Sequence, residues 1–277
     1  MNAASLKVAV AQINATLLDI EANLGVHADY IEQARNLGAE LLLFPELSLT
    51  GYQLGRNTPA AAMAPDDPRL LALARQAPEM LVVVGFVEQA GPGEYYNAAA
   101  YLQGGRVAGV HRKLNLPTYG GLEEGKWFHR GDDIPLVESK AGWRAATLIC
   151  ADMWNPALVH CAMLRRPELL LSPVNSASAI VSDAFSNERN WLTNVTFYAM
   201  IYGTPVLMAN RYGPELDARF WGGSRILGPR GEELAVAEDR ECLISAELSL
   251  EAIAQARFDH PAIRDGDTPL IRKLLPG

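Results

Sequence analysis

Short apolar runs alternate along the chain with longer stretches in which apolar residues recur every three or four positions. The first pattern is typical of buried β-strands and the second of amphipathic helices. The segments expected to form strands are 6–12, 40–44, 80–87, 95–102, 106–112, 145–150, 169–172, 205–210, 220–227, 233–237 and 241–247. A first helix is expected to begin after Asp19, which suits an N-cap, and to end at Gly38. Three more are expected at about 68–77, after Asn155 and at about 187–202.

The order of these segments combines hairpins with strand–helix–strand units, which favours an α/β protein with large mixed sheets. The almost wholly apolar run Glu40–Phe44 is typical of a strand that is covered on both faces. No stretch rich in Gly, Ser or charge divides the chain, so a single domain over residues 1–277 is expected. The biased stretch Pro59–Pro65 (PAAAMAP) is expected to be an exposed loop before a helix.

The acidic composition argues against negatively charged partners. The 277 residues include 32 Asp and Glu against 24 Lys and Arg, which gives a formal net charge of -8. Nucleic acids and anionic membranes attract clustered Lys and Arg, so neither is expected as a partner. No apolar run is long enough to cross a bilayer, and residues 1–11 lack the long apolar region of a secretory signal. These features predict a cytoplasmic protein.

The three cysteines, at positions 150, 161 and 242, match neither a disulfide framework nor the spacing of zinc ligands. Because the five histidines are also scattered, no metal and no other cofactor are expected. Cys161 lies on an expected helix at core spacing and Cys242 begins an apolar strand, so both are expected to be structural. No histidine occupies a motif of a Cys–His hydrolase, and His111 lies near Lys113 only by chance.

Three polar residues stand where apolar strands end, which is where sheet proteins tend to place their active sites. Glu46 follows Leu-Leu-Leu-Phe-Pro, Lys113 follows the strand 106–112, and Cys150 ends Ala-Ala-Thr-Leu-Ile-Cys. Cys150 would lie on a strand-to-helix turn, near helix-terminal amides that stabilise a thiolate. Taken singly, each residue type is commoner in a structural role, since a Cys at the end of a strand is usually inert core. Only the motifs around all three favour a catalytic role.

Those motifs are FPELSLTGY (44–52), HRKLNLPTYGGLEEGKWF (111–128), CADMW (150–154) and FWGGSRILGPRGEELA (220–235). In order and spacing they resemble the nitrilase superfamily of carbon–nitrogen hydrolases over nearly the whole chain. The resemblance implies a catalytic set of Glu46, Lys113 and Cys150, with a second glutamate in the loop after the lysine. Aligning that loop on its closing aromatic pair puts the second glutamate at Glu124, although the adjacent Glu123 leaves the choice open.

The reaction of the superfamily explains why these residue types are needed. The Cys150 thiolate would attack an amide carbonyl or a nitrile carbon. Glu46 would take the thiol proton, deliver it to the departing amine and then activate water. Lys113 and the backbone N–H of Ala151 would hold the developing oxyanion, and the ammonium would help to lower the pKa of the thiol. Glu124 would orient Lys113 and the substrate nitrogen.

The same resemblance implies a fold, a four-layer αββα sandwich of two mixed β-sheets. The order of elements given above is compatible with this fold but would not single it out. Superfamily members usually form dimers or larger assemblies, so a homodimer or a higher homo-oligomer is expected. The C-terminal tail, residues 258–277, resembles the segment that often reaches over a partner subunit.

Residues after the nucleophile bear on the substrate, which is expected to be a small molecule. Nitrilases tend to carry Trp-Glu after the cysteine, whereas this chain has Ala151–Asp152, a pattern more like the amidase, carbamoyl-amide and glutaminase branches. Hydrolysis of a small primary amide or an N-carbamoyl amine, with release of ammonia, is therefore expected. The pocket residues expected from the motifs are Tyr52, Tyr119, Ala151, Trp154 and the loop that begins at Asn175.

Two alternatives stay open on the sequence alone. One is a nitrilase proper, which would take a nitrile substrate, or an acyl-transfer enzyme on the same fold. The other is a non-catalytic protein on this fold, which the intact set of Glu46, Lys113 and Cys150 disfavours. Leu122 stands where an aromatic residue is common in the superfamily, and Gly125 adds flexibility to the same loop. The sequence therefore does not determine the shape of the pocket.

Overall fold

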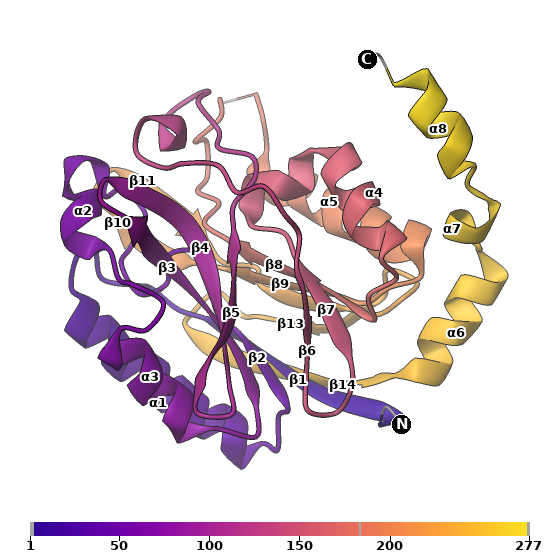
Figure 1. Ribbon diagram of the computed structural model, residues 1–277, viewed down its shortest axis with the longest axis horizontal. Helices are drawn as coiled ribbons and strands as arrows, with labels where there is room; N and C mark the ends of the chain where they lie inside the picture. The colour runs from indigo at the N-terminus through magenta and orange to yellow at the C-terminus, as the bar shows by residue number, and fades with distance from the viewer. Residues whose placement is uncertain (1–2, 183, 276–277) are drawn as a thin grey trace.

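Two six-stranded mixed β-sheets pack face to face to form the centre of the molecule (Figure 1). The computed structural model describes residues 3–182 and 184–275. The strands of the first sheet are, in spatial order, β14 (Cys242–Ser249), β1 (Ser5–Gln12), β2 (Leu41–Leu43), β3 (Leu81–Gly91), β4 (Glu94–Gln103) and β5 (Arg106–Arg112). Those of the second are β13 (Glu233–Val236), β12 (Arg225–Leu227), β9 (Val206–Asn210), β8 (Leu169–Val174), β7 (Arg144–Thr147) and β6 (Leu136–Glu138).

The two sheets share one plan. Parallel strands occupy the middle of each, namely β1, β2 and β3 in the first sheet and β7, β8 and β9 in the second. Antiparallel strands are added on both sides of these parallel strands in each sheet. Parallel neighbours need a crossover connection, and here helices provide it. They are α1 (Ile20–Asn36) and α3 (Pro68–Gln76) for the first sheet, and α4 (Pro156–Leu164) and α5 (Asn187–Tyr202) for the second.

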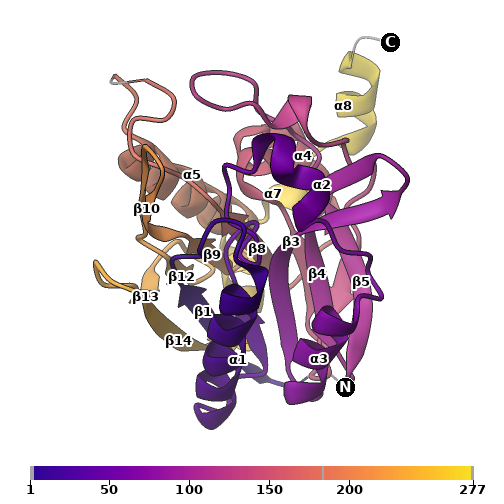
Figure 2. The same cartoon turned by 90° about the vertical axis from the view of Figure 1, so that its left-hand side faces the viewer.

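Apolar side chains fill three layers, and these define the sandwich. One layer joins α1 and α3 to the first sheet, with Ile31, Leu42 and Leu73 among its members. A second fills the space between the sheets, and a third joins α4 and α5 to the second sheet. Figures 1 and 2 show the helix pairs on opposite outer faces. The expected four-layer αββα sandwich of two mixed sheets is therefore confirmed.

The shorter elements lie at the ends of the sheets and at the C-terminus. They are η1 (Gly55–Asn57), α2 (Thr58–Ala61), η2 (Glu124–Lys126), η3 (Cys150–Trp154), the hairpin β10 (Tyr212–Glu215) and β11 (Ala218–Trp221), and the helices α6 (Leu250–Asp259), α7 (Ala262–Asp265) and α8 (Thr268–Leu274). Most expected elements are present within a few residues of their predicted bounds. Asp19 caps α1 as expected, since its carboxylate accepts a hydrogen bond of 3.1 Å from Ala22 N.

Four details of the sequence prediction are wrong. The segment 220–227 is not one strand, because Gly222 and Gly223 both have positive φ and separate β11 from β12. The stretch 59–65 is not an exposed loop, because it contains α2 and because the buried Met63 pairs with β3. The strand expected at 145–150 ends at Thr147, before the turn that carries the nucleophile candidate. Cys161 is exposed on α4 rather than in the core.

The C-terminal helices lie at the edge of the molecule. In Figure 1, α8 stands clear of both sheets, and none of its residues is buried. The expected tail 258–277 thus consists of the end of α6 with α7 and α8, and its last two residues lie outside the described residues. No helix in the described part of the chain has the length and apolar character needed to span a membrane.

Candidate active site

Cys150 lies on a tight turn between β7 and α4. Its φ is +45°, a left-handed conformation that costs a residue with a side chain roughly 1–3 kcal/mol. The buried carboxylate of Asp152 holds this turn by accepting a hydrogen bond of 3.0 Å from Ile149 N. Its other oxygen accepts from Leu114 N at 3.0 Å and from Asn115 N at 2.6 Å. Asp152 thereby fixes Cys150 against the segment that follows Lys113.

Glu46 reaches the same place from the first sheet, on the turn after β2. The turn lies directly on Gly85 of β3, where a Cβ atom would stand 2.3 Å from Leu47 N and 2.5 Å from Pro45 O. Only glycine allows this approach. The Ser48 hydroxyl accepts a hydrogen bond of 3.1 Å from Gly85 N, which fastens the turn to the strand.

Three charged side chains meet in the interior. The ammonium of Lys113, 0% exposed, donates to Glu46 Oε1 at 2.6 Å and to Glu124 Oε1 at 2.7 Å. Both carboxylates are buried as well. A charge in such a place is stable only with partners, and removing one member of a buried pair costs about 3–5 kcal/mol. The sequence left open which glutamate accompanies Lys113, and the structure places Glu124 there. Glu123 is exposed and pairs instead with Lys126.

Asn97 completes this cluster and was missed in the sequence. Its side-chain Nδ2 donates to Glu46 Oε1 at 2.7 Å and lies 3.4 Å from Glu124 Oε2. Its backbone carbonyl accepts from Lys113 N at 2.8 Å. An asparagine inside the apolar strand Tyr-Tyr-Asn-Ala-Ala-Ala-Tyr-Leu was the available signal, since a buried amide must find partners.

The pKa of the Cys150 thiol depends on several opposing effects in the site. Burial and the charge of Glu46 raise the pKa of Cys150 well above its ordinary value. The Lys113 ammonium and the backbone N–H of Asn175 oppose this increase without cancelling it. The expected contribution of Lys113 is therefore present, but burial and Glu46 outweigh it, so the net pKa of the thiol is raised. A thiol with a raised pKa would need a base to act as a nucleophile.

The pKa values of three ionisable groups near the thiol, those of Lys113, Glu124 and Tyr52, are also shifted. Burial alone would lower the pKa of Lys113, but the charges of Glu124 and Glu46 outweigh it and raise that pKa well above its usual value. Burial raises the pKa of Glu124 to about 7, with a further increase from Glu46 against the opposing effect of Lys113. Tyr52 donates to Glu124 Oε1 at 2.6 Å, and burial raises the pKa of this phenol well above 10, so its proton stays in place.

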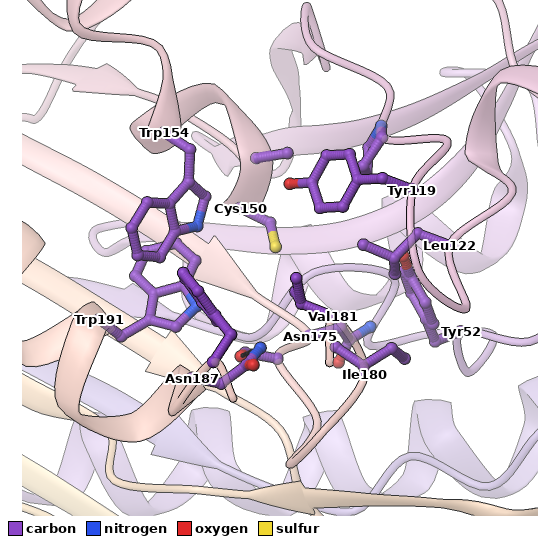
Figure 3. A pocket seen from close by; sticks show the side chains of 14 residues that line it. Tyr52, Tyr119, Leu122, Cys150, Trp154, Asn175, Ile180, Val181, Asn187 and Trp191 are labelled. Atoms are coloured by element: carbon purple, nitrogen blue, oxygen red, sulfur yellow. Dashed lines mark hydrogen bonds between the residues drawn. The ribbon is translucent and has the colours of Figure 1, made fainter. Parts of the chain in front are cut away.

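A cavity of about 240 Å³ opens beside Cys150 (Figure 3). All five residues expected in the pocket from the sequence line it, namely Tyr52, Tyr119, Ala151, Trp154 and Asn175. Five further lining residues were not predicted from the sequence, namely Ile180, Val181, Phe185, Asn187 and Trp191. Asn175 also supports the site, since its side-chain Nδ2 donates to Glu46 O at 2.7 Å. Among residues 3–182 and 184–275, no group of three or more His, Cys, Asp or Glu could hold a metal ion.

Comparison with known proteins assigns this arrangement to a family. A model of the carbon–nitrogen hydrolases matches residues 7–258. The chain belongs to the carbon–nitrogen hydrolase family. The resemblance to the nitrilase superfamily inferred from the four motifs is thereby confirmed, and the protein is a hydrolase of carbon–nitrogen bonds other than peptide bonds.

Individual relatives of this carbon–nitrogen hydrolase differ in length. The N-carbamoylputrescine amidase of Solanum lycopersicum is 27% identical over 93% of this chain and 91% of its own length. The glutamine-dependent NAD(+) synthetase of Thermotoga maritima is 29% identical over 89% of this chain. The match covers 42% of that synthetase, so the chain spans less than half of it.

A solved structure, the amidase from Nesterenkonia sp. AN1, superposes with a TM-score of 0.82 at 25% identity. The superposition covers 98% of this chain and 97% of that one. The structure is of a mutant in which the acetamide moiety of fluoroacetamide is added covalently at the active site cysteine.

Proposed function

We propose that the protein hydrolyses a small primary amide or an N-carbamoyl amine through a thioester on Cys150. The proposal rests on the hydrogen bonding of the Glu46 carboxylate. Its Oε1 is occupied by Lys113 and Asn97, whereas its buried Oε2 has no hydrogen-bond partner among the described residues. An unpartnered buried carboxylate oxygen next to a neutral thiol is a suitable proton acceptor. The influence of Glu46 on the pKa of Cys150 supports their proximity.

The first half of the reaction forms the thioester. Glu46 takes the Sγ proton as sulfur attacks the substrate carbonyl carbon, and the carbonyl oxygen becomes an oxyanion. Lysine has three N–H donors, and Lys113 uses two on Glu46 and Glu124, so one is left for this oxygen. The backbone N–H of Ala151 is the second donor of the proposed oxyanion site. Collapse of the intermediate breaks the C–N bond, and Glu46 returns its proton to the nitrogen that leaves as ammonia.

The second half restores the enzyme. Glu46 takes a proton from a water molecule, which attacks the thioester carbonyl, and the same two donors hold the oxyanion again. The C–S bond then breaks and Cys150 recovers its proton. One carboxylate serves both halves because sulfur, ammonia and water react at the same carbon in turn. Glu124 is proposed to keep Lys113 in place and to contact the substrate nitrogen.

Intact-protein mass spectrometry tests the nucleophile. Fluoroacetamide should add one acetamide moiety to the wild-type protein, and peptide mapping should locate it on Cys150. Cys150→Ala should take up none and should release no ammonia from acetamide. Cys161→Ala is the matched control and should behave as wild type. Turnover by folded Cys150→Ala would overturn the proposal, and turnover of nitriles with no turnover of amides or ureas would favour the nitrilase alternative.

A homo-oligomer is the proposed quaternary state. The helix α8 has seven residues, and an isolated helix of that length is unstable in water. Its apolar side chains Leu270, Ile271 and Leu274 are nevertheless exposed, as is Phe258 at the end of α6. A second copy of the chain would cover them. A cytoplasmic location stays a prediction from the sequence.

A further inference from the structure

The described residues that line the pocket beyond Cys150 are uncharged. Its described lining residues are Tyr52, Pro117, Tyr119, Leu122, Cys150, Ala151, Trp154, Asn175, Ser176, Ile180, Val181, Phe185, Asn187 and Trp191. None of these side chains carries a formal charge at neutral pH, with the thiol protonated. Aliphatic and aromatic groups make up most of the wall, and the polar groups are neutral amides and hydroxyls. Figure 3 shows the sulfur of Cys150 between the Tyr119 ring and the Trp154–Trp191 pair.

Two loops contribute neighbouring parts of the wall of this cavity. The loop after Tyr119 is hydrogen-bonded to the loop after β8, since Gly121 N donates to Ile180 O at 3.0 Å. Gly120 has a φ of +59°, and a Cβ atom there would stand 2.5 Å from Ile180 O. This close contact brings Ile180 and Val181 into the wall. The substrate group that points away from the scissile bond would therefore meet branched aliphatic side chains.

The charged groups of the site are engaged with one another. Lys113 is held between Glu46 and Glu124, and Glu124 also accepts from Tyr52. None of these three charged side chains lines the cavity. A charged substituent on the substrate would therefore lose its hydration without gaining an ionic partner from the described wall. Such a transfer is strongly unfavourable.

Aromatic rings can bind cations through their faces, so their arrangement here matters. Trp154 and Trp191 lie edge to face with centroids 5.0 Å apart, and Trp154 and Phe185 pack in the same way at 5.8 Å. The rings thus use their faces and edges on one another rather than presenting several faces to one point. This packing forms an apolar wall and not an aromatic cage.

We propose, on the basis of the amide hydrolysis proposed above, that the substrate carries an uncharged, apolar substituent on its carbonyl or carbamoyl nitrogen. The volume of about 240 Å³ lies below the range of roughly 300–1,000 Å³ of pockets for drug-sized ligands, so the substituent is short. The described wall offers no ionic partner to a free amino group such as that of N-carbamoylputrescine, or to the zwitterionic end of glutamine.

Matched substrates test the proposal, because a methyl and an ammonium group are similar in size. Hexanamide is compared with 5-aminopentanamide, and pentylurea with N-carbamoylputrescine, by ammonia release under kcat/KM conditions at neutral pH. Glutaramate and glutamine represent anionic and zwitterionic substrates, and acetamide is the short reference. In whichever pair, amide or urea, is hydrolysed faster, the kcat/KM of the uncharged substrate should exceed that of the cationic one by about 100-fold or more.

A charge introduced into the wall should reverse the preference. Val181→Asp should improve the kcat/KM ratio of cationic to uncharged substrate by about 10-fold or more relative to wild type. Val181→Asn is its control, since it has nearly the same shape and no charge, and it should leave the ratio close to that of wild type. Ile180→Asp with Ile180→Asn provides a second pair if the first fails to fold. Acetamide turnover normalises each variant for damage to catalysis.

The outcomes separate the two proposals. If acetamide and every longer amide and urea fail with the folded wild-type protein, the proposed amide hydrolysis is wrong. If turnover occurs and the cationic or zwitterionic substrate is equal to or better than its uncharged partner, only the substrate class is overturned. An equal response of Val181→Asp and Val181→Asn would likewise count against it.

Discussion

The hydroxyl of Tyr52 donates to the same oxygen of Glu124 that accepts the Lys113 ammonium, at 2.6 Å and 2.7 Å respectively. A hydrogen bond to a carboxylate favours its ionised form. Tyr52 therefore opposes the burial that raises the pKa of Glu124 to about 7. Since the ionised glutamate holds Lys113, we expect kcat/KM to fall as the pH decreases through about 7.

Tyr52→Phe removes that hydrogen bond and should raise the pKa of Glu124 further. The acidic limb of the pH profile should then move to higher pH, by about one unit. Tyr119→Phe is the control, because Tyr119 lines the pocket without a hydrogen bond to Glu124. The pH dependence of ammonia release measures both. An acidic limb that stays in place in Tyr52→Phe would show that Glu124 does not set it.

Asn97 is expected to position Glu46. Asn97→Leu deletes the donor that lies 2.7 Å from Glu46 Oε1, and loss of a bond to a charged group corresponds to about 10–100-fold in kcat/KM. Asn97→Asp should be worse, because it adds a negative charge beside two carboxylates. Kinetics and thermal unfolding of both variants would separate positioning from folding. Full activity in Asn97→Asp would contradict this role.

Gly85 is expected to set the position of Glu46 through the backbone alone. Gly85→Ala puts a methyl group 2.3 Å from Leu47 N, so the turn must move and activity should fall by about 100-fold or more. Gly25→Ala in α1 is the matched control, since nothing lies within 4 Å of its Cβ atom. That change should leave activity intact and add about 0.4–1 kcal/mol to the free energy of unfolding.

The tail is expected to act in assembly. Leu274 is 71% exposed on α8, and Leu274→Asp should weaken self-association of the chain. Lys273→Asp is the neighbouring control, since it changes a polar position and should leave the mass unchanged. Light scattering coupled to size-exclusion chromatography measures both. A wild-type protein that is monomeric at high concentration would contradict the proposed oligomer.

The sequence predicted the strands and crossover helices well because their apolar patterns are long and regular. It could not pair the two halves of the chain into facing sheets, since no local pattern records which apolar faces meet. The prediction of the fold rested instead on the family resemblance carried by the four motifs. Gly222 and Gly223 show the limit of pattern alone, because an apolar run on both sides concealed a break that depends on backbone conformation.

For the site, the motifs gave Glu46, Lys113 and Cys150, and the structure brings the first two into direct contact. The choice of Glu124 over Glu123 required the three-dimensional path of the loop, because the two residues are identical in type and adjacent. Asn97 was missed since its role depends on contacts with residues far along the chain. The net increase in the pKa of the thiol was not predicted, because the lysine nearby was considered without the burial and the Glu46 charge that outweigh it.

Cys161 and Cys150 differ in their exposure to solvent. Cys161 is exposed on α4, whereas Cys150 is part of the cavity wall and its pKa is raised by burial and by Glu46. Oxidants such as hydrogen peroxide react with thiolates in exposed positions. Mild oxidation should therefore modify the surface residue first and spare turnover. The same environment that makes the proposed nucleophile depend on a base would protect it from oxidation between substrates.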